Sequence, residues 1–137
     1  MSPAPPDRSI VVSLGEIMLR LKSPGHERLF QSPSLEATFA GGEANVAVSL
    51  ANYGLHARYV TALPDSPIGE GAVSALRGMG VDVEHVVRRP GRMGIYFVEA
   101  GANQRGSTEV YDRDQAAIAQ AAPDEFDWDA LIEGARS

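Results

Sequence analysis

The chain has 137 residues, a formal net charge of −6 at pH 7 and 44% apolar residues, with no cysteine. This length and apolar content suffice for one globular domain with a buried core. The acidic balance argues against general nucleic-acid binding, and the lack of cysteine excludes disulfides and cysteine-based zinc sites. Because His26, His56 and His85 lie far apart, we interpret them as ordinary surface or loop residues and expect no metal site.

The first nine residues are proline-rich and polar. We expect residues 1–9 to form a flexible tail. They contain no apolar core of a signal peptide, and no stretch of the chain approaches membrane-spanning length. We therefore expect a cytoplasmic protein, with neither a membrane nor a nucleic acid among its partners.

The next part of the chain alternates between strand and helix patterns. Ile10 to Leu14 is a short apolar run typical of a buried strand, and Ala57 to Ala62 is another. Apolar residues recurring every three or four positions predict a helix from Glu43 to Tyr53. A second helix is expected from about Ile68 to Met79, ending at Gly80. This alternation predicts an α/β fold with a mainly parallel sheet flanked by helices.

Two pairs of segments interrupt this alternation. Ile17–Leu21 and Leu35–Ala40 flank a turn-rich region, and Gly94–Ala100 and Thr108–Asp112 flank a polar loop. Each pair predicts an antiparallel ribbon. Plain surface hairpins and a lid over a ligand are both compatible with this pattern. A last helix is expected to begin after Asp127.

A glycine pair, Gly41 and Gly42, stands directly before the first expected helix. Glycine can adopt positive φ and lets the backbone lie close to a ligand, and ligands of such sheets bind near the carboxyl ends of strands. Asn45 lies in the first turn, where its amide can both donate and accept, which suits the hydroxyl pair of a polyol. In the alternative interpretation, the glycines make only a tight turn and Asn45 bonds nearby backbone. The apolar face of this helix is expected to comprise Val46, Ala47, Leu50 and Ala51.

Four ordered motifs resemble the N-terminal half of ribokinase-like (PfkB-type) carbohydrate kinases. They are Gly41 to Gly54, Val60 to Gly69, Gly94 to Phe97 and Tyr111 to Arg113. Four motifs at compatible spacing are far more specific than any one of them. The resemblance runs from about Val11 to the end of the chain, and it is strongest to the 2-keto-3-deoxygluconate kinase branch.

The resemblance implies a fold, and it implies which sites of the kinase lie in each half. Residues 10–137 would form the N-terminal part of a ribokinase-like α/β domain, with lid ribbons at about 17–40 and 94–112 that cover the sugar and pair two subunits as a homodimer. In these kinases the catalytic aspartate and most of the ATP site lie in the C-terminal half, and nothing here matches them. We therefore expect a truncated kinase without a catalytic residue, and no strong binding of the ATP and Mg²⁺ that the intact enzyme uses.

The lid segments hold the other candidate site residues. Tyr111 and Arg113 share one face of a strand at period two, and they match a Tyr-x-Arg arrangement that binds the sugar acid in the 2-keto-3-deoxygluconate kinase branch. By this resemblance, Arg113 pairs with the substrate carboxylate, while Tyr96 and Tyr111 supply hydroxyl donors and apolar ring walls. Asp112, between them, is expected to face away. The alternative is a cross-strand aromatic pair beside a surface arginine.

These features predict the substrate-binding half of an ATP-dependent sugar kinase. Its substrate is a sugar or a sugar acid, with 2-keto-3-deoxygluconate as the leading candidate, and the fragment itself is expected to be inactive. Two other functions stay open. One is a fructokinase- or ribokinase-like enzyme for a neutral sugar, and the other is a non-catalytic sugar-binding or dimerising module.

Overall fold

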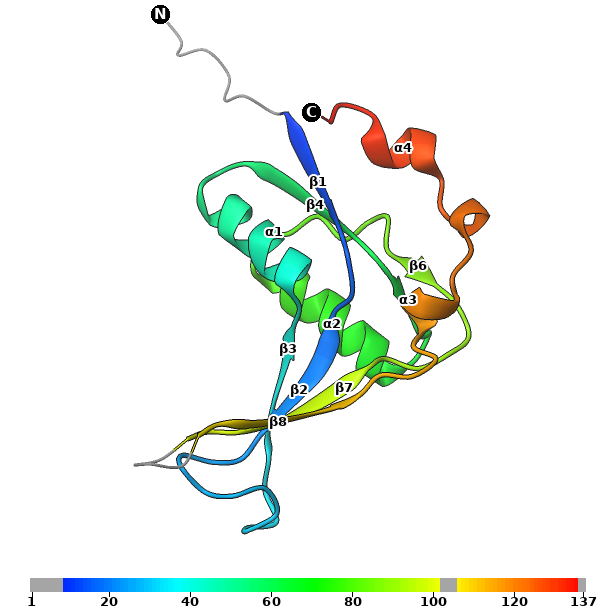
Figure 1. Cartoon of the computed structure of the whole chain (residues 1–137). Coiled ribbons are helices and arrows are strands. Elements are labelled where there is room, and N and C mark those ends of the chain that lie inside the picture. Colours follow the sequence, from blue (N-terminus) through cyan, green and yellow to red (C-terminus); the bar gives the residue numbers. More distant parts are fainter. Residues whose placement is uncertain (1–8, 102–105, 136–137) are drawn as a thin grey trace, which may run out of the picture.

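The fold is built on short parallel strands with helices packed against them (Figure 1). The computed structural model describes residues 9–101 and 106–135, so nearly all of the expected tail lies outside the described residues. β1 (Ile10–Leu14) pairs in parallel with β4 (His56–Val60), and α1 (Gly42–Asn52) connects them. The first strand has its expected bounds, and the first helix begins and ends one residue earlier than expected.

The second expected strand is interrupted at Thr61. β4 ends before this residue and β5 (Ala62–Leu63) begins after it, so the run expected as one strand forms two. β5 pairs in parallel with β6 (Val87–Arg88), and α2 (Pro67–Gly78) lies between them in the chain. The parallel pairings and the connecting helices confirm the predicted α/β class.

Glycines act differently at the two ends of α1. Gly41 precedes the helix with φ −173°, which is ordinary extended backbone, and Gly42 is not left-handed either, so neither glycine uses the positive φ that glycine can adopt. A Cβ on Gly41 would collide with the carbonyl oxygen of Glu16, whereas a Cβ on Gly42 would meet nothing. At the other end, Gly54 has φ +86° and follows the helix, a position that favours glycine.

The buried face of α1 is rotated from the expected one. Ala44 and Ala47 are buried, and Val48 packs against the same core, whereas Val46 is 54% exposed. The assignment of Val46 to the apolar face is therefore wrong. α1 packs on β1 and β4, and positions spaced by three and four residues from Ala44 face these strands.

The two predicted ribbons form one mixed sheet. β2 (Met18–Lys22) is antiparallel to β3 (Glu36–Ala40), and β7 (Ile95–Glu99) is antiparallel to β8 (Thr108–Asp112), which confirms both ribbons. β2 and β7 then pair in parallel, giving the order β3-β2-β7-β8. Figure 1 shows this sheet extending away from the helices.

The last elements pack on the other side of β1 and β4 from α1 (Figure 1). They are α3 (Ala117–Gln120), the 3-10 helix η1 (Pro123–Glu125) and α4 (Trp128–Ile132). α4 begins directly after Asp127, as expected. Beyond it, Ala135 forms a parallel bridge with Ile10.

Apolar clusters lie on both faces of β4. Tyr59 belongs to the cluster that contains the buried residues of α1 and α2, and Val60 belongs to the one that contains Phe126 and Leu131. Neighbouring residues of a strand point to opposite faces, so a strand covered on both faces reads as a continuous apolar run. Within the described ranges, no helix is both long enough and apolar enough to cross a membrane.

Candidate functional site

The carboxyl end of β1 meets the start of α1 at Glu16. The N–H of Gly15 donates to the carbonyl of Val60 at the end of β4, 3.3 Å away, which holds the chain at the edge of the parallel strands. The Glu16 carbonyl lies against Gly41, where no Cβ fits. The first N–H groups of α1 therefore lie at the sheet edge where ligands of α/β proteins bind.

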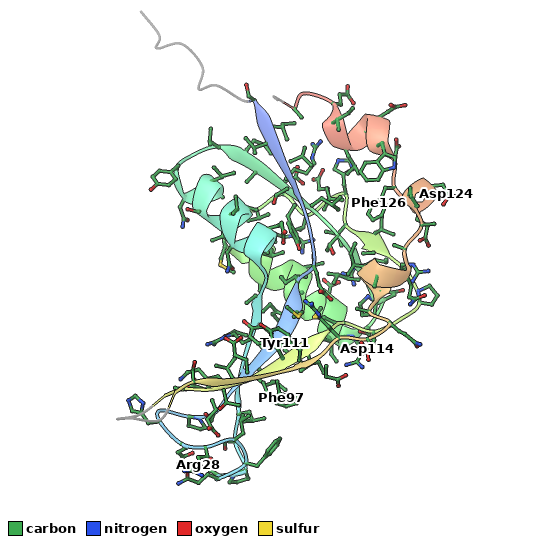
Figure 2. All side chains as sticks on the ribbon, viewed as in Figure 1. Arg28, Phe97, Tyr111, Asp114, Asp124 and Phe126 are labelled. Atoms are coloured by element: carbon green, nitrogen blue, oxygen red, sulfur yellow. The ribbon has the colours of Figure 1, made fainter. Side chains whose placement is uncertain are left out.

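Two stacked tyrosines lie on the four-stranded sheet. Tyr96 and Tyr111 are direct cross-strand partners, with ring centroids 5.5 Å apart and planes 19° apart; we call them the tyrosine stack. The guanidinium carbon of Arg113 lies 5.4 Å from the Tyr111 ring centroid. Figure 2 shows Tyr111 and Phe97 on opposite faces of the ribbon, as period two predicts. The structure thus brings three of the six candidate residues together.

A carboxylate orients the Tyr111 hydroxyl. This hydroxyl donates to Oε2 of Glu109, 3.0 Å away. The hydrogen bond to the negatively charged carboxylate raises the pKa of the Tyr111 phenol. The single hydrogen of this hydroxyl is therefore engaged with Glu109, and its oxygen remains able to accept a hydrogen bond from a ligand hydroxyl.

Arg113 forms an ion pair with Glu16, which lies in the chain between β1 and β2. Its Nη1 lies 3.6 Å from Oε1 of Glu16, with side-chain exposures of 56% and 24%. Asp112 pairs instead with Arg92, whose Nη1 donates to its Oδ1 at 2.9 Å. The hydrogen bond from Arg92 lowers the pKa of Asp112. Asp112 is thus engaged away from Arg113, as the alternation predicted.

Asn45 and the glycine pair lie apart from the tyrosine stack. Asn45 is exposed and lines a cleft of about 320 Å³ between α1, α2 and β3. Within the described part of the chain, no hydrogen bond or ion pair joins Asn45 or Gly42 to the stack or to Arg113. Glu16, which the sequence did not single out, lies against Gly41 with its carbonyl and pairs with Arg113 through its side chain.

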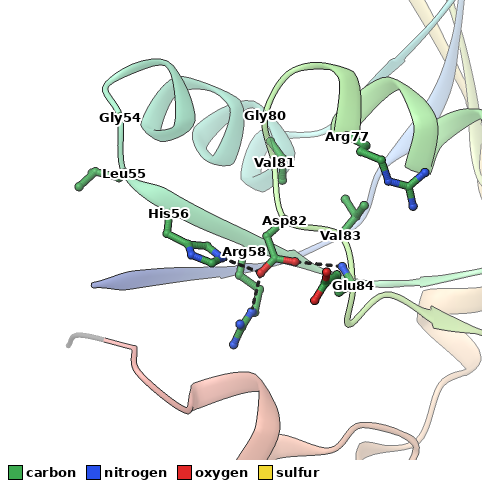
Figure 3. Close-up of a pocket in the computed structure, with 10 residues that line it drawn as sticks. All are labelled: Gly54, Leu55, His56, Arg58, Arg77, Gly80, Val81, Asp82, Val83 and Glu84. Carbon is green, nitrogen blue, oxygen red and sulfur yellow. Dashed lines mark hydrogen bonds and ion pairs between the residues drawn. The ribbon is translucent and has the colours of Figure 1, made fainter. Parts of the chain in front are cut away.

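A second cavity of about 730 Å³ opens at the amino end of β4 (Figure 3). There Asp82 Oδ2 lies 2.8 Å from Nε2 of His56 and accepts from Nε of Arg58 at 3.1 Å. Its Oδ1 accepts from the N–H of Glu84 at 3.0 Å. Burial opposes ionisation of Asp82, but these hydrogen bonds outweigh it, so the pKa of Asp82 lies below its ordinary value.

Arg58 extends this network to α4. Its Nη1 donates to the carbonyls of Ala130 and Leu131 at 3.2 and 2.9 Å. The buried charges are thus paired within the chain, and we assign the network a structural role. Interpreting His56 as an ordinary surface or loop residue missed this pairing, because its partners come from a distant segment.

Metal-ligand side chains do not gather in the part of the chain that the structure describes. Residues 9–101 and 106–135 contain no group of three or more His, Cys, Asp or Glu side chains that could hold a metal ion. Coordination of Mg²⁺ beside nucleotide phosphates uses carboxylate oxygens. We therefore derive no phosphoryl-transfer step from these residues.

Comparison with known proteins agrees with this architecture. The profile of the pfkB family carbohydrate kinases matches residues 8–135. A 2-dehydro-3-deoxygalactonokinase of Haloferax volcanii is 38% identical over 125 residues, covering 91% of this chain and 39% of that protein. The crystal structure of 2-dehydro-3-deoxygluconokinase from Thermotoga maritima has a TM-score of 0.91 at 49% identity, covering 94% of this chain and 40% of that one. An uncharacterized sugar kinase from Pyrococcus horikoshii, solved with ATP, shares the fold, with a TM-score of 0.79, 24% identity and coverage of 90% and 40%.

The fold is therefore that of the ribokinase-like sugar kinases. The chain belongs to the pfkB family of carbohydrate kinases, which confirms the resemblance seen in its motifs. It corresponds to the N-terminal part of its relatives. It spans 39% of the length of the Haloferax volcanii kinase and 40% of that of the Thermotoga maritima kinase.

Proposed function

We propose that this chain is the substrate-binding part of an ATP-dependent kinase for a sugar acid, with 2-keto-3-deoxygluconate as the leading substrate. The observation that carries the proposal is the position of Arg113 beside the tyrosine stack, in a sugar-kinase fold. The relatives named above support it, because 2-dehydro-3-deoxygluconate is the same compound as 2-keto-3-deoxygluconate and the galactonate differs in configuration only.

Arg113 is the group that distinguishes a sugar acid from a neutral sugar. Its planar guanidinium presents donors that match two carboxylate oxygens at once. The side chain is more than half exposed, so donors remain accessible beside the pairing with Glu16. Tyr96 and Tyr111 provide an aromatic wall for the carbon chain of the substrate, and the Tyr111 oxygen accepts from a substrate hydroxyl while its hydrogen is donated to Glu109.

The start of α1 binds the sugar hydroxyls in this proposal. Gly42 leaves open space where other residues carry a Cβ. Backbone N–H groups of the first turn, beginning beside Gly41, have no partner within the helix and are donors for a ligand. The amide of Asn45 donates and accepts, as a pair of hydroxyls requires.

Phosphoryl transfer belongs, in this proposal, to the intact kinase and not to this chain. The transfer depends on positioning of the phosphoryl group and on stabilisation of its charge, for which ATP is bound with Mg²⁺. We expect the 137-residue chain to release no ADP above a blank, with any sugar or sugar acid, in a coupled assay. Turnover above the blank contradicts this division.

Binding of two matched ligands tests the proposed substrate class. They are 2-keto-3-deoxygluconate and 3-deoxyfructose, in which a hydroxymethyl group replaces the carboxylate. Arg113→Ala should weaken the acid by about ten-fold or more, because a charge-assisted bidentate contact contributes about 1.5–3 kcal/mol. Binding of 3-deoxyfructose should not change. Isothermal titration calorimetry on the chain measures both dissociation constants.

Arg92→Ala is the matched control, since Arg92 is an arginine of the same sheet region that pairs with Asp112. It should leave both ligands unaffected, whereas Asn45→Ala should weaken both. Equal losses of the two ligands in Arg113→Ala would show that Arg113 is structural and that a neutral sugar is the better substrate.

We further propose that the sheet face carrying Phe97 pairs two copies of the chain as a homodimer. On this face the ring of Phe30 is 72% exposed and lies 6.0 Å from the ring of Phe97, and exposed apolar patches mark interaction sites. Charge substitutions Ile95→Glu and Phe97→Glu should lower the mass seen by light scattering, whereas Tyr53→Glu at the end of α1 should not. A dimer that survives both sheet substitutions rules this surface out.

A further inference from the structure

Glu16 connects the two separated parts of the candidate site. It lies between β1 and β2, two residues before β2 begins, where the chain passes from the parallel strands to the four-stranded sheet. Its carbonyl oxygen lies against Gly41 at the start of α1. Three residues later, the N–H of Leu19 donates to the carbonyl of Gly94 at 2.9 Å. The backbone of Glu16 is thus held between the helix start and the lid strands.

The side chain of Glu16 reaches Arg113 through space that Gly94 leaves open. A Cβ on Gly94 would lie 2.8 Å from Cβ of Arg113 and 3.0 Å from Oε2 of Glu16. A side chain at position 94 would therefore crowd both members of the pair and force at least one of them to shift. Glu16 occupies the less exposed side of the pair, and no hydrogen bond within the described residues engages the other N–H groups of Arg113.

We propose that Glu16 is a positioning residue, which orients the guanidinium of Arg113 toward the carboxylate of a sugar acid without contacting the substrate. This proposal rests on the proposed function, because it takes Arg113 as the carboxylate-binding group. A guanidinium has two edges and five donors, so one edge can pair with Glu16 while the other binds the substrate carboxylate. The positive charge then lies between the two negative ones. An arginine on an exposed strand has many rotamers, and a fixed partner reduces the entropy lost when the substrate binds.

The test compares charge-removing variants of the 137-residue chain on 2-keto-3-deoxygluconate and 3-deoxyfructose. Glu16→Gln keeps the size of the side chain, and we expect the dissociation constant of the acid to rise about three- to five-fold. That of 3-deoxyfructose should stay the same. Glu84→Gln is the control, because Glu84 lines the cavity at the amino end of β4, away from the proposed site, and its side chain forms no ion pair within the described residues. Tighter acid binding in Glu16→Gln, or equal weakening of both ligands, overturns the proposal.

A double-mutant cycle separates this proposal from the proposed function. In an Arg113→Ala background, Glu16→Gln should have no further effect on the acid. The same loss in both backgrounds overturns the positioning role alone. If Arg113→Ala itself leaves acid binding unchanged, or the chain binds neither ligand, the proposed function fails and the positioning role fails with it.

The ligand-free chain supplies a readout independent of sugar binding. The side-chain Nε–Hε signal of Arg113 in an NMR spectrum should shift in Glu16→Gln. It should also shift in Gly94→Ala, which pushes the two side chains apart while keeping both charges. Glu84→Gln should leave it in place. A signal that stays unchanged in Glu16→Gln overturns the proposal.

Discussion

Arg58 joins β4 to α4, and replacing it with methionine should destabilise the chain. Its side chain is 9% exposed, and its Nε donates to Asp82 at 3.1 Å. Its Nη1 donates to the carbonyls of Ala130 and Leu131 at 3.2 and 2.9 Å. Methionine preserves part of the aliphatic packing of arginine but makes none of these hydrogen bonds.

The expected cost follows from what Arg58→Met leaves behind. Removing one partner of a buried ion pair costs about 3–5 kcal/mol, because the other charge stays buried. Asp82 is 12% exposed and keeps the contacts with His56 and the Glu84 N–H. We therefore expect the lower end, about 3 kcal/mol. The free energy of unfolding of a small domain is about 5–15 kcal/mol, so a loss of this size is a large fraction of the stability.

Urea unfolding followed by circular dichroism measures this loss as a change in the free energy of unfolding. Arg77→Met is the matched control, because Arg77 lines the same cavity but its side chain makes no hydrogen bond or ion pair within the described residues. It should change stability by less than about 0.5 kcal/mol. Similar losses in Arg58→Met and Arg77→Met would refute the reasoning. The double variant with Asp82→Asn should lose less than the sum of the single variants, since both remove one interaction.

Three further predictions concern stability. Gly41→Ala should destabilise the chain, because the added Cβ collides with the Glu16 carbonyl. Gly42→Ala, in open space within α1, should be neutral or stabilise the chain by up to about 1 kcal/mol. Equal changes in the free energy of urea unfolding for the two variants contradict the packing argument. Because the folded-state pKa of Asp82 lies below the ordinary 3.8, its stabilisation should be fully present above that pH and be lost as the pH falls further. A difference between wild type and Asp82→Asn that does not depend on pH between 2 and 6, roughly the range that brackets the carboxyl titration, contradicts this. Ser66→Ala should cost about 1 kcal/mol, because Ser66 caps α2, and a thermal midpoint equal to that of wild type counts against the cap.

The sequence alone determined most of the longer local elements, although the run expected as one strand forms β4 and β5. The apolar run at β1, the three-to-four periodicity of α1 and α2, and the alternating patterns of the two ribbons predicted each element within about two residues. The shared face of Tyr111 and Arg113 also followed from period two, and the structure shows it as a ring–guanidinium contact. Secondary structure and the face on which a side chain lies depend on residues nearby in the chain, so the sequence pattern predicts them. The roles of these residues in binding stay predictions.

Only the tertiary structure decided how these elements meet. The parallel pairing of β2 with β7 turns two hairpins into one sheet, and it alone brings Arg113 to Glu16. The network of His56, Arg58 and Asp82 joins two distant segments in the same way. Ion pairs and cross-strand contacts depend on distance in space. Residues at many different separations in the sequence can form them, so the spacing of residues does not predict them. The exposed Val46 has the same origin: the strands beneath α1 select which of its apolar residues are buried.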